Sequence, residues 1–539
     1  MMDKEGQTGV NQKVARQHSM LRRVVLVLTA WAIVATTYGA YTSIWGTTSS
    51  LVTSIDHSVK VKRDENCDGD KKNKKNVIFM VSDGMGPASV NLARTFRQYK
   101  DDLKYDDTLT LDDHLVGALR TRSNSSYITD SAAAGTTFAC GKKTTNGAIA
   151  VLPDGETACG TVLEAAKLQG YTTGLVVTTS ITDATPATLS AHAAERDDED
   201  FIAEQQIGKG RLGRVVDLMI GGGRCHFVPK DSSDDACRKD DRDLVKEAQE
   251  DGWSYFDDLE GFKKLNGGDD AKLPLLGLLA PEDLPYEIDR EDSKYPSLED
   301  TTKTALKALA KASEDSEQGF FVMIEGSRID HAGHANDAAA QVHEVLAYDA
   351  AFKAALEFAK ESDTETIVVS TSDHETGGLS VARSLEGQSQ SEWHPEYFIN
   401  ATHSSEYLFE KLGDLDSDDD DKIRDFIKKD IIEKGLGITN YTDDEVESIF
   451  KQREDSAIPI VNVTNVRSQT GWSSEGHSAV DVNLYGFTNN EDTDLLRGNN
   501  ENTDIAEYFA KYLDLDLDAV TEKLEGIKVS SGNLEEDDE

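Results

Sequence analysis

Residues 77–86 read VIFMVSDGMG, an apolar run of strand length that ends just before Asp83. Two later runs have the same form: FFVMIEG at 320–326 contains Glu325, and IVVSTSDH at 367–374 ends in Asp373 and His374. Ligand sites in a parallel α/β sheet lie beyond the carboxyl ends of the strands, so these side chains should converge at one edge. A single acid after a strand more often caps the next helix, but three such runs favour a shared site.

The same pattern predicts the fold class. Short β-branched runs alternate with helical stretches rich in Ala, Leu and Lys, which is typical of an α/β protein with a mainly parallel central sheet covered by helices. With 539 residues, of which 38% are hydrophobic, the chain can form one large domain or two ordinary ones. The predicted buried strands are Val77–Val81, Gly174–Thr179, Phe320–Ile324 and Ile367–Ser370.

Composition divides the chain further. From about 377 to 470 the pattern becomes irregular and predicts an inserted subdomain, in which the acidic run Asp414–Lys422 is expected to be a solvated surface loop. One helix is expected to run from Ala506 to about Gly526. The predicted segments are a polar cytosolic tail at 1–23, a transmembrane anchor at 24–45, a charged stalk at 46–75, the catalytic domain at 76–526 and an acidic tail at 527–539.

The N-terminal apolar segment predicts the location of the protein. Residues 24–45 carry no charge and are long enough to cross a bilayer as a helix, whereas a cleaved signal peptide, the rival interpretation, has a shorter apolar stretch. Basic residues before the segment favour a cytosolic N-terminus, hence a single-pass type II membrane protein. The absence of a hydrophobic C-terminal stretch argues against a GPI anchor. Four glycosylation sequons follow the segment, at Asn124, Asn400, Asn440 and Asn462.

The cysteines and the charge narrow the class of protein. Five cysteines suit one or two disulfides in an oxidising compartment; Cys225 and Cys237 are the preferred pair, and Cys67 is the expected odd cysteine. The formal net charge of -44, from 56 basic and 100 acidic residues, argues against nucleic-acid binding. An anionic substrate would need a local positive potential, for instance from bound metal ions.

The histidines and acids offer metal ligands. In EGSRIDHAGH, Asp330 and His334 stand four residues apart, which is ligand spacing for zinc on one face of a turn or helix. The Asp373-His374 pair offers an oxygen and a nitrogen to a second ion, and His477 lies in the turn-like GWSSEGHSA. These residues predict about two zinc sites, with an oxygen-rich set left for a harder magnesium ion.

A serine and an arginine complete the candidate site. In YITDSAAAGTT, Ser131 begins a run of small residues that predicts a helix start, where free N–H groups and the helix dipole favour an alkoxide or a phosphate. The alternative is that Ser131 belongs to an ordinary helix cap with no catalytic role. Zinc would stabilise the serine alkoxide. In TDATPATLSAHAAER, Asp183 and Thr185 lie at a strand-to-helix junction, and Arg196, about three helical turns on, can grip two phosphate oxygens.

These motifs, in this order from Asp83 to His477, resemble those of the alkaline phosphatases. The resemblance implies a three-layer α/β/α sandwich, broad hydrolysis of small phosphate monoesters through a phosphoserine on Ser131, and a homodimer. It also implies two zinc ions and one magnesium ion per subunit. The implied ligands are Asp330, His334 and His477 for the first zinc, Asp83, Asp373 and His374 for the second, and Asp83, Thr185 and Glu325 for magnesium, with Arg196 holding the phosphoryl group.

Two residues expected near the metal ligands combine features of different members of the family. Asp183 resembles the bacterial members and His331 the animal ones, and both are expected beside the ligands; the hard oxygen donors favour magnesium as the third metal. The anchor, the sequons and the C-terminus resemble fungal members in the vacuole membrane, with the cell surface or secretion as alternatives. The rival functions are a phosphodiesterase or sulfatase, which would lack the DSAAA serine or Arg196, and a noncatalytic metal-stabilised lumenal binding domain.

Overall fold

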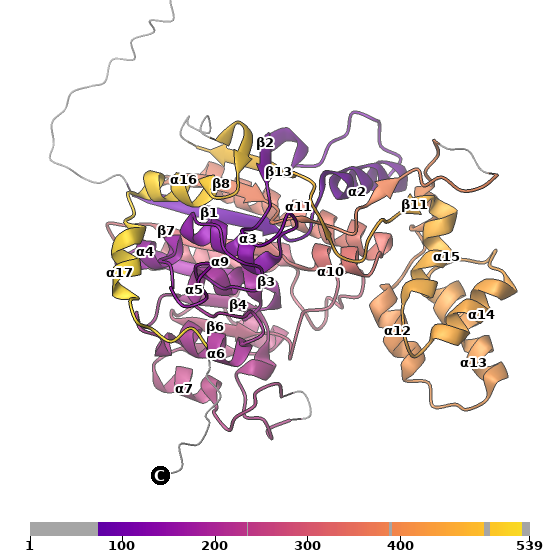
Figure 1. Ribbon diagram of the computed structural model, residues 1–539, viewed down its shortest axis with the longest axis horizontal. Coiled ribbons are helices and arrows are strands. Elements are labelled where there is room, and N and C mark those ends of the chain that lie inside the picture. Colours follow the sequence, from indigo (N-terminus) through magenta and orange to yellow (C-terminus); the bar gives the residue numbers. More distant parts are fainter. Residues whose placement is uncertain (1–73, 234–235, 388–390, 490–495, 531–539) are drawn as a thin grey trace, which may run out of the picture. The chain divides into compact units, whose positions relative to one another are not determined.

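The computed structural model describes residues 74–233, 236–387, 391–489 and 496–530 (Figure 1). Its centre is a ten-stranded sheet in the order β14-β2-β13-β8-β1-β7-β3-β4-β6-β5. The strands are β1 (Lys75–Ser82), β2 (Leu115–Arg120), β3 (Thr172–Ser180), β4 (Leu218–Gly222), β5 (Ser254–Phe256), β6 (Leu275–Leu278), β7 (Phe320–Gly326), β8 (Glu365–Thr371), β13 (Val482–Thr488) and β14 (Gly498–Glu501).

The sheet is mainly parallel, as predicted, and the four expected strands form its middle. β1 pairs in parallel with β7 on one side and with β8 on the other. The register aligns Val81 with both Glu325 and Thr371, so the three acid-bearing strands end at the same level. β13 alone runs antiparallel to its neighbours β2 and β8.

Both faces of the sheet are buried under helices. Alternate residues of β1 point to opposite faces. Phe79 lies in the core under α3 (Ser131–Cys140) and α16 (Asp504–Leu513), where its ring meets Phe138 and Phe509 at centroid distances of 5.6 and 5.2 Å. Ile78 and Met80 lie in the second core with α9 (Leu298–Ala312) and α11 (Ala338–Glu361). The result is the expected three-layer arrangement.

The remaining helices connect these layers. Around the sheet they are α2 (Pro87–Lys100), α4 (Val162–Leu168), α5 (Ala184–Ser190), α6 (Glu199–Glu204), α7 (Leu244–Glu250), α8 (Leu259–Lys263), α10 (Arg328–His334) and α17 (Leu517–Lys523). Two short two-stranded sheets pair β9 (Glu375–Thr376) with β12 (His477–Ser478) and β10 (Ser380–Val381) with β11 (Thr470–Gly471). The pairing of β9 with β12 brings the C-terminal part of the chain to the end of β8.

The inserted region is helical rather than irregular. It contains α12 (Ser405–Gly413), α13 (Asp420–Phe426), a π-helical stretch (Ile427–Gly435), α14 (Asp443–Gln452) and α15 (Ile458–Ser468), which we call the helical subdomain. Leu408, Ile431 and Ile449 belong to a hydrophobic core of its own. Within the acidic run, Asp419 caps α13 by accepting hydrogen bonds from the backbone of Asp421 and Lys422, so the run is not wholly a loop.

Two further expectations are wrong. The C-terminal helix is broken into α16 and α17, because Asp514 adopts a left-handed conformation with φ 58° and ends α16. The predicted type II membrane localisation is contradicted: within the ranges that the structure describes, no helix combines the length and the apolar character needed to cross a bilayer. The predicted tail, anchor and most of the stalk, with Cys67, lie outside the described residues.

Candidate active site

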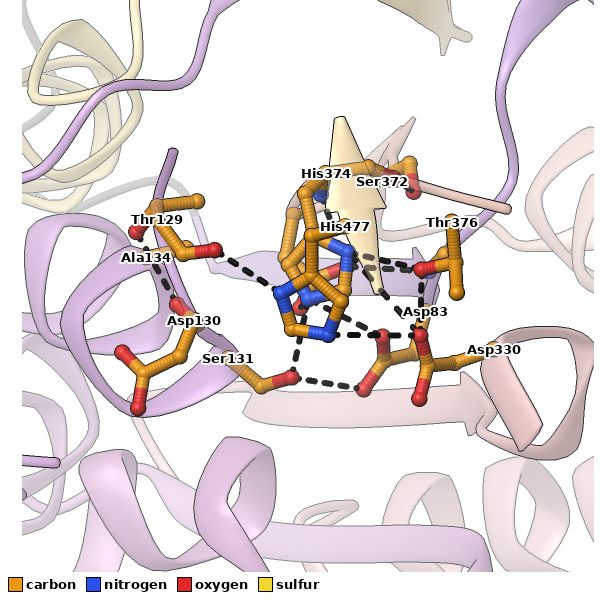
Figure 2. Close-up of polar contacts among 12 residues, drawn as sticks. Asp83, Thr129, Asp130, Ser131, Ala134, Asp330, Ser372, His374, Thr376 and His477 are labelled. Atoms are coloured by element: carbon orange, nitrogen blue, oxygen red, sulfur yellow. Dashed lines mark hydrogen bonds and ion pairs between the residues drawn. The ribbon is translucent and has the colours of Figure 1, made fainter. Parts of the chain in front are cut away.

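Ser131 is the first residue of α3, as the sequence predicts. Asp130 caps the helix: its carboxylate accepts hydrogen bonds from the backbone N–H of Ala133 at 2.9 Å and of Gly147 at 2.8 Å. The Ser131 hydroxyl lies 3.2 Å from Asp83 Oδ2 and 3.1 Å from His374 Nε2 (Figure 2). The small residues of α3 allow close packing, since a Cβ at Gly135 would meet Thr188 Oγ1 at 2.6 Å.

The predicted second zinc set comes together at the ends of β1 and β8. Donor atoms of Asp83, Asp373 and His374 lie within 4.8 Å of one another, and all three residues are buried. Asp373 Oδ1 accepts hydrogen bonds from the backbone N–H of Gly84 at 3.1 Å and of His374 at 2.9 Å. Its other oxygen, Oδ2, lies 3.1 Å from His374 Nε2 but accepts no hydrogen bond from the described residues.

The predicted magnesium set shares the same chemistry. Asp83 Oδ1 and Glu325 Oε1 are buried and, like Asp373 Oδ2, have no hydrogen-bond partner in the described part of the chain. Burial and then neighbouring carboxylates raise the pKa of both Asp83 and Glu325 well above the ordinary carboxyl value. The Ser327 hydroxyl donates to the other oxygen of Glu325, Oε2, at 2.9 Å, and Thr185, buried in the first turn of α5, partly opposes the rise in the Glu325 pKa. Buried, unpaired carboxylate oxygens are costly without a counterion, so this donor set fits a divalent cation.

The predicted first zinc set lies next to it. In α10, Asp330 Oδ2 and His334 Nε2 are 3.2 Å apart, and His334 Nε2 lies 3.1 Å from His477 Nε2. The rings of His374 and His477 stack with centroids 3.6 Å apart (Figure 2). Burial opposes ionisation of Asp330, yet its histidine partners lower its pKa overall, while burial lowers the pKa of His374 to about 4. The ionised Asp330 and the neutral His374 are the forms that bind zinc, whereas the hydrogen bond to Asp330 raises the pKa of His334.

Gly84 allows the two sets to lie side by side. It follows Asp83 and has φ +74°, a conformation that favours glycine. A Cβ at this position would lie 2.5 Å from Asp330 Cα and 2.9 Å from Asp330 Oδ1. The backbone after β1 therefore touches α10 through the space of a missing side chain.

Arg196 reaches the site from a loop, not from the helix that the spacing suggested. α5 ends at Ser190 because Ala191 adopts an extended conformation. Arg196 Nη2 donates to Asp183 Oδ1 at 2.8 Å, and its Nη1 lies 3.8 Å from Asp130 Oδ2. Burial opposes the charge of Arg196, but Asp183 and Asp130 raise its pKa overall. The guanidinium is thus held beside the start of α3.

Sequence reasoning missed several partners of these residues. Thr376 donates its hydroxyl to Asp330 Oδ1 and lies 3.2 Å from His374 Nδ1. It also faces His477 across the pairing of β9 with β12, and its place two residues after His374 was the available signal. His331 Nδ1 lies 3.3 Å from Asp283 Oδ2, not against Asp183. Nothing in the sequence near Asp283 indicated this contact.

The structure also answers the disulfide prediction. Cys225 and Cys237 are bonded, as predicted. A second disulfide was not predicted: it joins Cys140, the last residue of α3, to Cys159. The sequon residues Asn124, Asn400, Asn440 and Asn462 are all exposed.

Comparisons with known proteins give a consistent result. A model of the alkaline phosphatase family matches residues 74–515. The chain is 51% identical over 480 residues to the repressible alkaline phosphatase of Saccharomyces cerevisiae, covering 85% of this chain and 84% of that protein. Its fold is similar to the crystal structure of Thermus thermophilus alkaline phosphatase, with a TM-score of 0.70 at 26% identity over 82% of this chain and 92% of that one. A substituted TAB5 alkaline phosphatase with Mg bound in its M3 site has a TM-score of 0.56 at 25% identity, covering 82% and 99%.

Proposed function

Because the chain belongs to the alkaline phosphatase family, we propose that the residues gathered around Ser131 carry out the hydrolysis of phosphate monoesters for which the family is named. The observation that carries the assignment is the Ser131 hydroxyl, which begins a helix and lies within 3.2 Å of Asp83 and His374. In this proposal Ser131 Oγ attacks phosphorus and the P–O bond to the alcohol breaks, with the serine proton ending on the departing alcohol oxygen. A water then attacks the phosphoserine, which releases phosphate and returns a proton to Oγ to restore the hydroxyl. No redox partner is required.

The metal ligands follow from the same donor sets. Zinc would be held by Asp330, His334 and His477 and by Asp83, Asp373 and His374, and magnesium by Asp83, Thr185 and Glu325. Bound cations would supply positive charge to the phosphoryl group, in addition to that of Arg196, in an otherwise acidic chain. The unpaired oxygens of Asp83, Asp373 and Glu325 support this assignment. The magnesium bound in the TAB5 relative supports magnesium as the third metal.

The other residues of the site orient the phosphate and its acceptor. Arg196, already positioned by Asp183, presents its planar fork to two nonbridging oxygens. Asp130 holds the start of α3, so that backbone N–H groups at this helix start face the phosphoryl group. Thr376 fixes the orientation of Asp330 and His374 by bonding to both.

One experiment tests nucleophile and ions together. The purified full chain is analysed for zinc and magnesium and labelled with radioactive phosphate at acidic pH, and the labelled peptide is sequenced. We expect both metals, and label on Ser131 that disappears in Ser131→Ala together with p-nitrophenyl phosphate turnover. The control Ser125→Ala changes an exposed serine of the preceding loop and should label normally. Label on another residue, or unchanged turnover in Ser131→Ala, would overturn the mechanism.

Two further proposals concern the surface. The exposure of the four sequon residues supports their glycosylation, which an endoglycosidase-dependent shift in gel mobility tests one Asn→Gln variant at a time. The homodimer that the family resemblance implies stays a prediction. Sedimentation velocity of the purified chain distinguishes it from a monomer.

A further inference from the structure

Arg328 is a buried arginine in the helix that carries two of the proposed zinc ligands. It lies two residues before Asp330 in α10, and its side chain is 6% exposed. Its Nη2 donates to both carboxylate oxygens of Glu406, at 2.9 and 2.8 Å, and its Nη1 donates to the carbonyl oxygen of Leu284 at 2.9 Å. The guanidinium carbon lies 3.8 Å from the centre of the Tyr286 ring. Arg328 itself has no place in the proposed chemistry.

Its partner Glu406 belongs to the helical subdomain, in the first turn of α12. The start of α12 is attached to the main domain at two more points. Asp337 Oδ2 accepts a hydrogen bond from the backbone N–H of Ser405 at 2.6 Å, while its Oδ1 caps α11 through Ala340 at 3.0 Å. One carboxylate thus holds the first turns of two helices.

The second attachment lies beside it. Asp289 Oδ1 accepts hydrogen bonds from the backbone N–H of Ser404 at 3.0 Å and from His403 Nδ1 at 3.0 Å. From α15, Asn465 Nδ2 donates to the carbonyl oxygen of Asn336 at 2.9 Å, in the turn between α10 and α11. Asn336 and Asp337 closely follow α10, so two of these contacts attach the subdomain beside the helix that carries Asp330 and His334.

The arrangement has a physical consequence for α10. The helix has seven residues, too few to hold its shape without tertiary contacts. Arg328 is buried, whereas the side chain of Glu406 is 45% exposed, so the pair adds little net stability. It nevertheless favours one geometry, because without Glu406 the buried Arg328 charge would lose this carboxylate partner. The contact of Arg328 Nη2 with both oxygens of Glu406 therefore fixes the position of α10 more than it stabilises the protein.

We propose that Arg328 is a positioning residue through which the helical subdomain sets the affinity of the site of Asp330, His334 and His477 for zinc. This inference rests on the zinc-ligand roles proposed above. The subdomain is then part of the metal site's support. The contrasting explanation, that the pair only attaches the subdomain, predicts a change in stability without a change in zinc affinity.

The test compares two variants of the full chain. Glu406→Gln removes one charge of the pair that contacts α10. Glu445→Gln removes the matching charge from a pair inside the subdomain, where Arg467 Nη2 donates to Glu445 at 3.0 Å, and glutamine can keep the capping box at Thr442. Zinc release from each loaded protein to a chromogenic chelator is followed, with hydrogen exchange of residues 328–337 in the metal-free proteins.

We expect Glu406→Gln to release zinc about tenfold more readily, because substitutions of residues that support metal ligands commonly weaken metal binding by that amount. Exchange across 328–337 should increase, kcat should fall more than KM rises, and Glu406→Asp should recover part of the loss. Glu445→Gln should match the wild type in zinc release and exchange. Equal zinc release from wild type and Glu406→Gln, or equal weakening in both variants, would overturn the inference. A wild type that binds no zinc would instead refute the proposed function.

Discussion

Replacing Gly84 with alanine tests whether activity requires the close approach of the two proposed zinc sites. The new Cβ would lie 2.5 Å from Asp330 Cα, whereas ordinary contact begins at 3.4 Å, so the end of β1 and α10 must separate by about 0.9 Å, the difference of these distances. A misplacement of about 1 Å at an active site can cost on the order of a hundredfold in rate, or about 2.7 kcal/mol of barrier. We therefore expect kcat/KM to fall about a hundredfold.

A second glycine separates this clash from backbone strain. Gly155 has φ +75°, nearly the same as +74° at Gly84, but a Cβ there would meet nothing within 4 Å. Both alanine variants should lose the roughly 1–2 kcal/mol that the left-handed conformation costs, measured by denaturant unfolding. Only Gly84→Ala should lose turnover of p-nitrophenyl phosphate in zinc-saturated steady-state assays. If the two variants show the same kcat/KM, the close contact between Gly84 and Asp330 does not control the site.

Three further outcomes follow from the structure. The pKa values of Asp83 and Glu325 are raised above the ordinary 3.8 and 4.5, so the metal-free protein loses stability as pH rises through them. The difference in Tm between metal-loaded and metal-free protein should therefore widen from pH 5 to 8. A constant difference would contradict this. Arg196→Lys keeps the charge but not the fork, and we expect about a tenfold loss in kcat/KM with weaker inhibition by inorganic phosphate; unchanged inhibition would refute bidentate binding. Burial opposes protonation of His192, but Glu164, 2.9 Å away, raises the His192 pKa overall. Glu164→Gln should therefore lower the free energy of unfolding by about 3 kcal/mol near pH 6, and by less as pH rises above the His192 pKa. Calorimetry can test this. A loss of stability that grows with pH would contradict this prediction.

The sequence predicted the sheet and the convergence of the site for physical reasons that act locally. The β-branched runs before Asp83, Glu325 and Asp373 form β1, β7 and β8, and parallel pairing then requires their ends to meet. The start of α3 at Ser131 follows from its cap, because Asp130 is a favoured cap and the next residues are small. The spacing of Asp330 and His334 likewise needs only one helical turn.

The remaining features depend on contacts between distant segments. Arg196 was expected on a helix because the run after Asp183 reads as helical, but Ala191 ends α5 and pairing of Ile149 with Ala193 holds the following chain extended. The contact of His331 with Asp283 joins residues from separate elements and leaves no local pattern. The inserted subdomain was predicted but its helices were not, because its many acidic residues obscured an apolar periodicity that becomes evident only in its separate core.

The position of β13 has a consequence for how the protein is made. This strand, Val482–Thr488, fills the gap between β2 and β8, and His477 arrives just before it. A ribosome delivers the chain from its N-terminus, so Asp83, Ser131 and Asp373 are all synthesised while that gap is still open. Until then β8 has one unpaired edge and β2 has no strand partner, because β14 also follows β13 in the chain. The nascent protein also lacks His477, a proposed zinc ligand, and its unpaired edges make it prone to aggregation. Completion of the proposed metal site and closure of the sheet therefore both wait for residues 477–501 to be synthesised.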